Sequence, residues 1–296
     1  DALLLVPAID QTDRDWFETH GIQVMECPLP ISDDKWRYHE RLTHFPAIVL
    51  LRYHLFGAQF RRWDTVVYLD CDIIVMGELE RLLSVTKFGA VGDPGLPLCA
   101  NFANRHAFSQ AFGMKQDPRP DFGTFNSGVF AFRPRRLSLS TSEYLTDLSV
   151  RLQGMLIYPN QAVMNAVFWN LWEGLPLRCN FLPPGAPFHR LLSHPRGELG
   201  LILHFMGLAK PWDRRHPYNA LWKRSLAGAD QLPALWSSVP PPNHRAGPPA
   251  RLTILLLIEM TRWYRVTMRT AKRLVKRLLL IGPKWRRNGC WPEERR

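Results

Sequence analysis

Short apolar, β-branched runs alternate with helical patterns along the first two thirds of the sequence, and this alternation limits the possible folds most. The runs expected to form strands are residues 3–6, 22–27, 65–69, 88–92, 128–132 and 201–204. Helical patterns lie between them, at residues 13–19, 47–56, 79–84, 142–153 and 161–168. Such alternation predicts an α/β fold with a mostly parallel sheet flanked by helices on both faces.

Positive charge is concentrated at the C-terminal end of the chain. The net charge at pH 7 is +12, yet residues 251–296 contain 13 Lys or Arg against 3 Asp or Glu, and residues 1–250 contain 25 against 23. The body is therefore nearly neutral, and no interleaving of basic and aromatic residues marks a groove for nucleic acid. We accordingly expect no nucleic-acid partner.

Composition further divides the chain into three parts. Six prolines fall between residues 233 and 249, which is typical of an extended linker. The segment after them separates basic and apolar residues onto different faces of one long predicted helix. We predict a globular domain over residues 1–222, a Pro-rich linker over 223–250 and a basic amphipathic helical tail over 251–296.

The predicted tail helix, residues 251–281, suits an anionic membrane surface. Its uninterrupted apolar run, residues 254–258, is far shorter than the ~20 residues that a membrane crossing needs. Two alternatives remain for this helix: binding to a protein partner, and packing as a solvated charged helix against the body.

The segment TVVYLDCDIIV, residues 65–75, ends an apolar strand in two carboxylates. Ligands bind α/β sheets beyond the carboxyl ends of parallel strands, and side chains two apart in an extended backbone share a side. Asp70 and Asp72 would therefore face one crevice. Paired carboxylates repel unless a cation or a shared proton lies between them, and carboxylate oxygens favour Mg²⁺, Mn²⁺ or Ca²⁺. The pattern predicts a metal site for a phosphorylated ligand, although a single D-x-D also occurs by chance in turns and caps.

Three further segments place polar residues at the ends of predicted elements. They are FNSGVFAFRP (125–134), YPNQAVMNAVFW (158–169) and ILHFMGLAKPW (202–212). An imidazole from His204 would shift metal preference from Mg²⁺ toward Mn²⁺. Lys210 can offset diphosphate charge, and Gly207 lets backbone approach phosphates closely. Taken singly, His204 could also be a histidine at a strand end whose hydrogen bonds are made within the protein. Lys210 could equally be a solvent-exposed loop lysine.

In this order, the four segments resemble the glycogenin-type members of glycosyltransferase family eight, over about residues 3–212. The match includes DPG at residues 93–95. The resemblance implies a GT-A fold and retaining transfer of a sugar from a nucleotide sugar with Mn²⁺, Mg²⁺ being the alternative ion. Plant-type glucuronosyltransferases that act on xylan or sphingolipids share the same motifs.

The resemblance also implies a role for each matching residue. The metal ligands would be Asp70, Asp72 and His204, with Asp70 also near the ribose. Gly207 and Lys210 would hold the diphosphate. The residues expected at the donor sugar are Asp93, Asn126, Ser127, Asn160 and Gln161, and those expected to act in catalysis are Lys210, Gln161 and Asp93.

The sequence departs from the family at several points. Asn160 stands where glycogenin-like sequences have an aspartate, and Arg52 stands roughly where they have a donor-binding lysine. The chain begins at what looks like the family's second strand, so we expect the first strand to be missing. Residues 96–124 form an insertion that we expect to be a surface loop, the alternative being part of an acceptor site. No tyrosine lies in the segment directly after LPLRCN, residues 175–180, so glycogenin-type self-glucosylation at that position lacks its acceptor.

The expected function is transfer of a hexose or hexuronic acid from a UDP-sugar donor to a polysaccharide, lipid or protein acceptor. The alternative is a non-catalytic or truncated GT-A-fold protein that binds membranes or partners through its basic tail. The lumen of the Golgi or another endomembrane is the expected compartment, and the cytoplasm if the chain acts like glycogenin.

Overall fold

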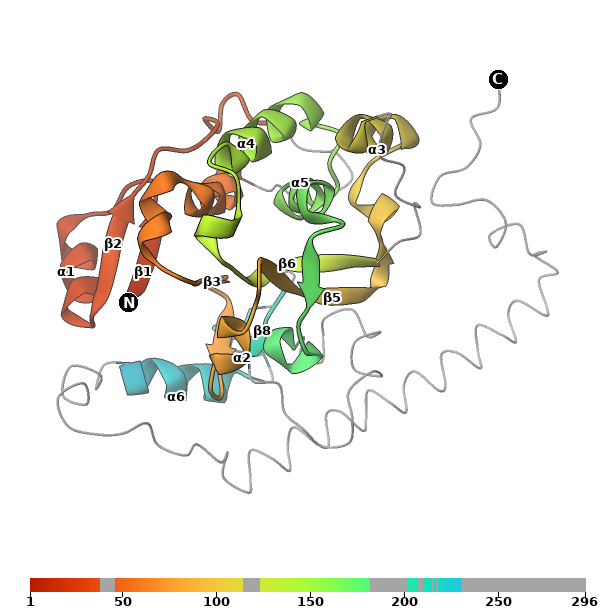
Figure 1. Ribbon diagram of the computed structural model, residues 1–296. Helices are drawn as coiled ribbons and strands as arrows, with labels where there is room; N and C mark the ends of the chain where they lie inside the picture. The colour runs from red at the N-terminus through yellow and green to blue at the C-terminus, as the bar shows by residue number, and fades with distance from the viewer. Residues whose placement is uncertain are drawn as a thin grey trace, which may run out of the picture.

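The computed structural model describes residues 1–37, 46–113, 123–181, 202–206, 210–214, 216 and 218–229 (Figure 1). Gly207, the predicted linker beyond residue 229 and the predicted tail lie outside the described residues. The elements run in the order β1 (Ala2–Val6), α1 (Gln11–Thr19), β2 (Ile22–Glu26), η1 (Ala47–Phe56), η2 (Ala58–Arg62), β3 (Val66–Leu69), β4 (Ile73–Val75), α2 (Glu80–Leu83), β5 (Phe88–Pro97), η3 (Leu98–Asn101), α3 (Arg105–Phe112), β6 (Gly123–Phe132), η4 (Pro134–Arg136), α4 (Thr141–Leu152), α5 (Pro159–Phe168), β7 (Trp172–Gly174), η5 (Leu177–Asn180), β8 (Ile202–His204) and α6 (Asn219–Ala229).

The strands form a central sheet of order β3-β6-β5-β7 and two small sheets, β1-β2 and β4-β8. The α/β class is confirmed, but the prediction of mostly parallel strands is wrong for the described pairs. β1 with β2 and β5 with β7 are parallel, whereas β3 with β6, β5 with β6, and β4 with β8 are antiparallel. All but the first residue of β6 are buried, and its second half, residues 128–132, is continuously apolar as in a parallel strand. Hydrophobicity therefore did not encode its direction.

Helices cover the two faces of the central sheet unequally. Helices α3, α4 and α5 lie on one side of it, while α2, α6 and β8 lie on the other (Figure 1). The larger core fills the first side, where Phe88 stacks on Phe168 with ring centroids 4.1 Å apart and also packs against Phe125 and Phe130. This rigid aromatic layer supports β5 and β6, which carry much of the site described below.

Local signals explain where several helices begin and end. Asp10 caps α1 by accepting a hydrogen bond from the backbone N–H of Asp13, and Gly21 follows the helix with φ +74°, a left-handed conformation that ends helices. Pro159 opens α5, where a missing N–H costs nothing. The segment 47–56 forms a 3-10 helix, and most of its residues are buried.

The predicted loop at residues 96–124 is wrong in its described part, which forms the end of β5, η3 and α3. Phe108 and Phe112 of α3 are buried in the larger core. Sequence reasoning also missed β4, β7 and α6. Helix α6 runs past residue 222, and the division into domain, linker and tail stays a prediction. Within the described residues, no helix is both long and apolar enough to span a membrane.

Candidate metal and donor-sugar site

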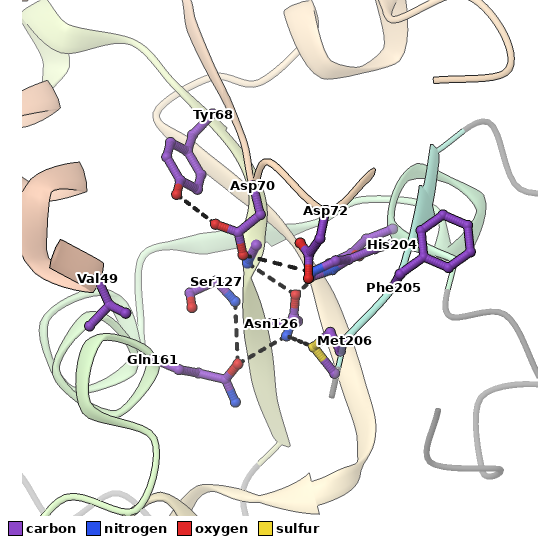
Figure 2. A network of polar contacts seen from close by, with 12 residues as sticks. Val49, Tyr68, Asp70, Asp72, Asn126, Ser127, Gln161, His204, Phe205 and Met206 are labelled. Atoms are coloured by element: carbon purple, nitrogen blue, oxygen red, sulfur yellow. Dashed lines mark hydrogen bonds and ion pairs between the residues drawn. The ribbon is translucent and has the colours of Figure 1, made fainter. Parts of the chain in front are cut away.

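Asp70 and Asp72 follow β3 directly, and two separate strand pairings position them. The backbone N–H of Asp70 donates to the Gly128 carbonyl on β6 over 2.8 Å, which continues the β3–β6 ladder. The carbonyl of Asp72 accepts from Phe205 N–H over 2.9 Å, just beyond the β4–β8 pair. The D-x-D segment is therefore anchored on both sides, and β8 brings His204 to it (Figure 2).

The two carboxylates and the imidazole form a group that fits a metal ion. His204 Nε2 lies 3.3 Å from Asp72 Oδ1 and 3.7 Å from Asp70 Oδ2. One potential ligand atom from each residue lies within 4.8 Å of the others. His204 is buried and both carboxylates are partly buried, so their charges need a positive partner. Two oxygens and one imidazole nitrogen suit Mn²⁺, and the three residues predicted as ligands do meet in space.

Gly128 makes this arrangement possible. A Cβ at Gly128 would lie 2.2 Å from His204 Cε1 and 2.7 Å from Asp70 Oδ2, which is too close for either atom. The glycine of the NSG segment thus leaves the space that the imidazole and carboxylate occupy. Its function is steric, because the residue lies within a strand and not at a turn.

Lys210 also reaches the carboxylate pair. Its Nζ donates to Asp72 Oδ2 over 2.5 Å and to the Phe205 carbonyl over 3.0 Å. Burial opposes ionisation of Asp72, but hydrogen bonds and positive charge from His204 and Lys210 outweigh it and lower the pKa of Asp72 to about 2. Asp72 therefore stays a carboxylate at neutral pH. The predicted lysine lies at the predicted site, although in this structure it contacts a carboxylate.

Arg52 and Tyr68 hold the other carboxylate. Sequence analysis matched Arg52 only loosely to a donor-binding lysine and did not assign Tyr68 to the site. Arg52 donates from Nη2 to Asp70 Oδ1 over 3.0 Å and from Nη1 to the Ser127 carbonyl over 2.7 Å. Its guanidinium lies 4.6 Å from the ring centroid of Tyr68, whose hydroxyl donates to Asp70 Oδ1 over 2.6 Å. Burial acts to lower the pKa of Arg52, but the Asp70 carboxylate raises it. Asp70 Oδ1 is thus occupied by two donors, which leaves Oδ2 turned toward His204.

A buried network of amides lies next to the metal ligands. Asn126 Nδ2 donates to Gln161 Oε1 over 3.1 Å, and the backbone N–H of Ser127 points at the same oxygen over 3.4 Å. Asn160 Nδ2 donates to Ser127 Oγ over 2.9 Å. Figure 2 shows Asn126, Ser127 and Gln161 beside the carboxylate pair. Four of the residues predicted at the donor sugar, Asn126, Ser127, Asn160 and Gln161, therefore contact one another.

Two residues from outside the predicted motifs complete this network. Asn101, on η3 of the insertion, accepts from Gln161 Nε2 over 3.3 Å. Asn180, at the end of η5, donates to Asn126 Oδ1 over 2.7 Å. Both asparagines are fully buried. Neither asparagine lies in one of the predicted motifs, so the local sequence did not point to them. The only general indication is that asparagines are seldom buried unless they are hydrogen-bonded.

Asp93 lies on β5, apart from the other predicted site residues. It is buried and pairs with Thr124, two positions from the pair formed by Val91 and Asn126. Its charge, together with the larger effect of burial, raises the pKa of Tyr158 at the start of α5. Asp93 thus lies in the ladder that carries Asn126. Gly207 is the one predicted site residue outside the described residues.

Changing Gly128 to alanine tests the steric requirement. We expect Gly128→Ala to lower the free energy of unfolding by about 1–3 kcal/mol, because its Cβ must displace His204 or Asp70. Gly123→Ala is the matched control on the same strand, where a Cβ meets no atom within 4 Å. Urea denaturation of both variants measures the difference. Equal stability of the two would show that the site does not need a glycine at residue 128.

Comparison with known proteins identifies the family. The sequence matches the model of glycosyl transferase family 8 over residues 3–216. The glycosyltransferase GlyE of Streptococcus pneumoniae serotype 4 is 26% identical over 210 residues, which are 68% of this chain and 46% of GlyE. Glycogenin-2 of Homo sapiens is 26% identical over 219 residues, which are 72% of this chain and 38% of glycogenin-2. The chain thus spans less than half the length of either relative.

Solved structures agree on the fold. The galactosyltransferase LgtC in complex with donor and acceptor sugar analogs aligns with a TM-score of 0.55 at 18% identity, covering 80% of this chain and 86% of LgtC. A crystal structure of GlyE from Streptococcus pneumoniae aligns with a TM-score of 0.52 at 22% identity, covering 82% of this chain and 58% of that one. With a family match over most of its length and this fold, the chain belongs to glycosyltransferase family 8 and has the GT-A architecture.

Proposed function

We propose that the protein is a retaining, Mn²⁺-dependent glycosyltransferase. It would move a hexose or hexuronic acid from a UDP-sugar to a glycan, lipid or protein acceptor. The observation that carries the proposal is the convergence of Asp70, Asp72 and His204, with Lys210 on the same carboxylate pair. Family membership supports the same reaction class.

In this proposal the three ligands would hold the ion, and each is already oriented by other contacts. Arg52 and Tyr68 fix Asp70 from one side, and strand β8 fixes His204. The nitrogen ligand favours Mn²⁺ over Mg²⁺. When bound, the ion supplies positive charge that stabilises the leaving diphosphate.

Lys210 would exchange its carboxylate partner for the diphosphate. Its Nζ lies 2.5 Å from Asp72 Oδ2 and is partly exposed, so it can turn toward a ligand at the same carboxylates. A lysine amine is a mobile cation with three donors, which suits charge that develops on a leaving phosphate. Gly207 stays a predicted diphosphate contact.

The amide network would bind the donor sugar. Asn126, Ser127, Asn160 and Gln161 are mutually hydrogen-bonded and buried, so their donors and acceptors are fixed before a sugar arrives. Asp93 would contact the sugar from β5. The acceptor hydroxyl would attack the anomeric carbon of the sugar from the same face as the leaving diphosphate. Gln161 would lie beside that carbon.

Release of UDP tests the proposal directly. The panel is UDP-glucose, UDP-galactose, UDP-glucuronic acid and UDP-xylose with Mn²⁺. We expect Asp72→Asn to reduce release by about 100-fold or more, because it removes a carboxylate that would hold the ion whose positive charge stabilises the leaving diphosphate. Asp64→Asn is the control for charge, since Asp64 is an exposed carboxylate. Equal release by wild type and Asp72→Asn would contradict the proposal.

A second candidate function is a non-catalytic GT-A-fold binding protein. Asn160 favours it, because an amide that donates to Ser127 replaces the carboxylate of glycogenin-like sequences. This candidate predicts that UDP with Mn²⁺ raises the melting temperature while no donor releases UDP. It further predicts release by Asn160→Asp. Release by the wild-type chain would exclude it.

The predicted tail helix, residues 251–281, remains a proposed anchor for an anionic membrane, and the Golgi lumen remains the proposed compartment. The support for the anchor is the basic amphipathic pattern alone, and the compartment rests on the family resemblance alone. Co-sedimentation with phosphatidylserine vesicles should fall strongly when Arg262, Arg265 and Arg269 are changed to Gln. Undiminished sedimentation would contradict membrane binding through this helix.

A further inference from the structure

Asn180 lies between the proposed metal site and the amide network. Its side chain contacts both: Nδ2 donates to Asn126 Oδ1 over 2.7 Å, and Oδ1 lies 2.9 Å from His204 Nδ1. Asn180, Asn126 and His204 are all buried, with at most 3% of each exposed. Because water does not reach these atoms, their hydrogen bonds to one another determine which atom of each pair is the donor.

One backbone group determines which atoms in this chain of hydrogen bonds carry protons. The N–H of Gly128 donates to Asn126 Oδ1 over 3.0 Å, and a backbone N–H can only donate. The Asn126 atom is therefore the carbonyl oxygen, so the Asn180 atom 2.7 Å away is the amide nitrogen. The other end of Asn180 is then an oxygen, which can only accept. His204 Nδ1 must carry the proton between them.

This assignment of protons leaves only one nitrogen of the His204 ring free to bind an ion. With Nδ1 protonated and donating to Asn180, only Nε2 of His204 faces Asp70 and Asp72. We propose that Asn180 is a positioning residue for the metal site: it fixes the orientation and tautomer of His204 so that Nε2 is the ligand. A second partner of this kind on a ligating histidine raises metal affinity. The inference rests on the proposed function, because it assumes that an ion binds there.

The backbone keeps Asn180 and His204 in register. Phe181 N–H donates to the Ile202 carbonyl, and His204 N–H donates to the Phe181 carbonyl, both over 2.8 Å. Little freedom is therefore lost when the two side chains meet. Gly128 leaves room for the Cε1 and Nδ1 atoms of the ring. Through Asn126, the same hydrogen bonds continue to Gln161 in the proposed sugar site.

Two variants of Asn180 separate its two contacts. Asn180→Ala removes both. Asn180→Asp keeps an acceptor for His204 Nδ1–H but places a carboxylate oxygen against Asn126 Oδ1. Asn165→Ala is the matched control, since Asn165 is equally buried and its hydrogen bonds join only backbone groups of Phe125 and Gln161.

The first measurement is Mn²⁺ affinity, by electron paramagnetic resonance of free Mn²⁺ on the full chain. We expect Asn180→Ala to weaken binding by about 10- to 100-fold. Asn180→Asp and Asn165→Ala should bind close to wild type. Wild-type affinity in Asn180→Ala, or equal weakening in Asn165→Ala, would overturn the positioning role.

The second measurement is ¹H–¹⁵N NMR of imidazole N–H groups in metal-free protein. Wild type should show a His204 Nδ1–H signal, identified by its loss in His204→Gln. The signal should persist in Asn180→Asp and vanish in Asn180→Ala. Persistence in Asn180→Ala would overturn the inference. If wild type binds no Mn²⁺, the proposed metal dependence and the positioning role both fail, while this signal still reports whether Asn180 orients the ring.

Discussion

The negative charges of Asp70 and Asp72 have to be balanced in a place where water reaches them only partly, and the site is organised around this requirement. Arg52 neutralises Asp70 from the side of η1, and Lys210 neutralises Asp72 from the segment after β8. His204 lies against both carboxylates. Removing a cation from such a group leaves an uncompensated buried charge, which is costly. A divalent ion that shares these oxygens would relieve the repulsion that Lys210 offsets in this structure.

The fold supplies this balance by joining segments that are far apart in the sequence. The β3–β6 pairing brings residues 126–128 beside Asp70, and the β4–β8 pairing brings His204 beside Asp72. Behind β5 and β6, the stacked phenylalanines hold the strands in place. The site therefore stands on rigid elements, so its polar side chains need little reordering to bind a ligand.

Much of this site could be predicted from sequence, because its motifs place charged and polar side chains at the ends of predicted strands and helices. Asp70, Asp72, His204 and Lys210 do converge, and so do the polar residues of α5 and β6. Arg52 was matched only loosely, to a donor-binding lysine, and its contact with Asp70 was not predicted. Asn180 was not assigned, because it lies outside the four motif segments and its partners Asn126 and His204 lie 54 and 24 residues away. Strand direction was also not encoded, since β6 is buried on both faces and its second half is apolar throughout. The insertion looked like a loop because its short helices bury few, scattered phenylalanines.

The most direct test of the account is a crystal structure of the protein with Mn²⁺ and UDP, with anomalous scattering recorded at the manganese edge. The account predicts one strong anomalous peak bonded to Asp70, Asp72 and His204 Nε2, with Lys210 Nζ moved from Asp72 to the diphosphate. UDP bound without a peak at these residues, or a peak at other residues, would contradict the metal site on which the proposed function rests.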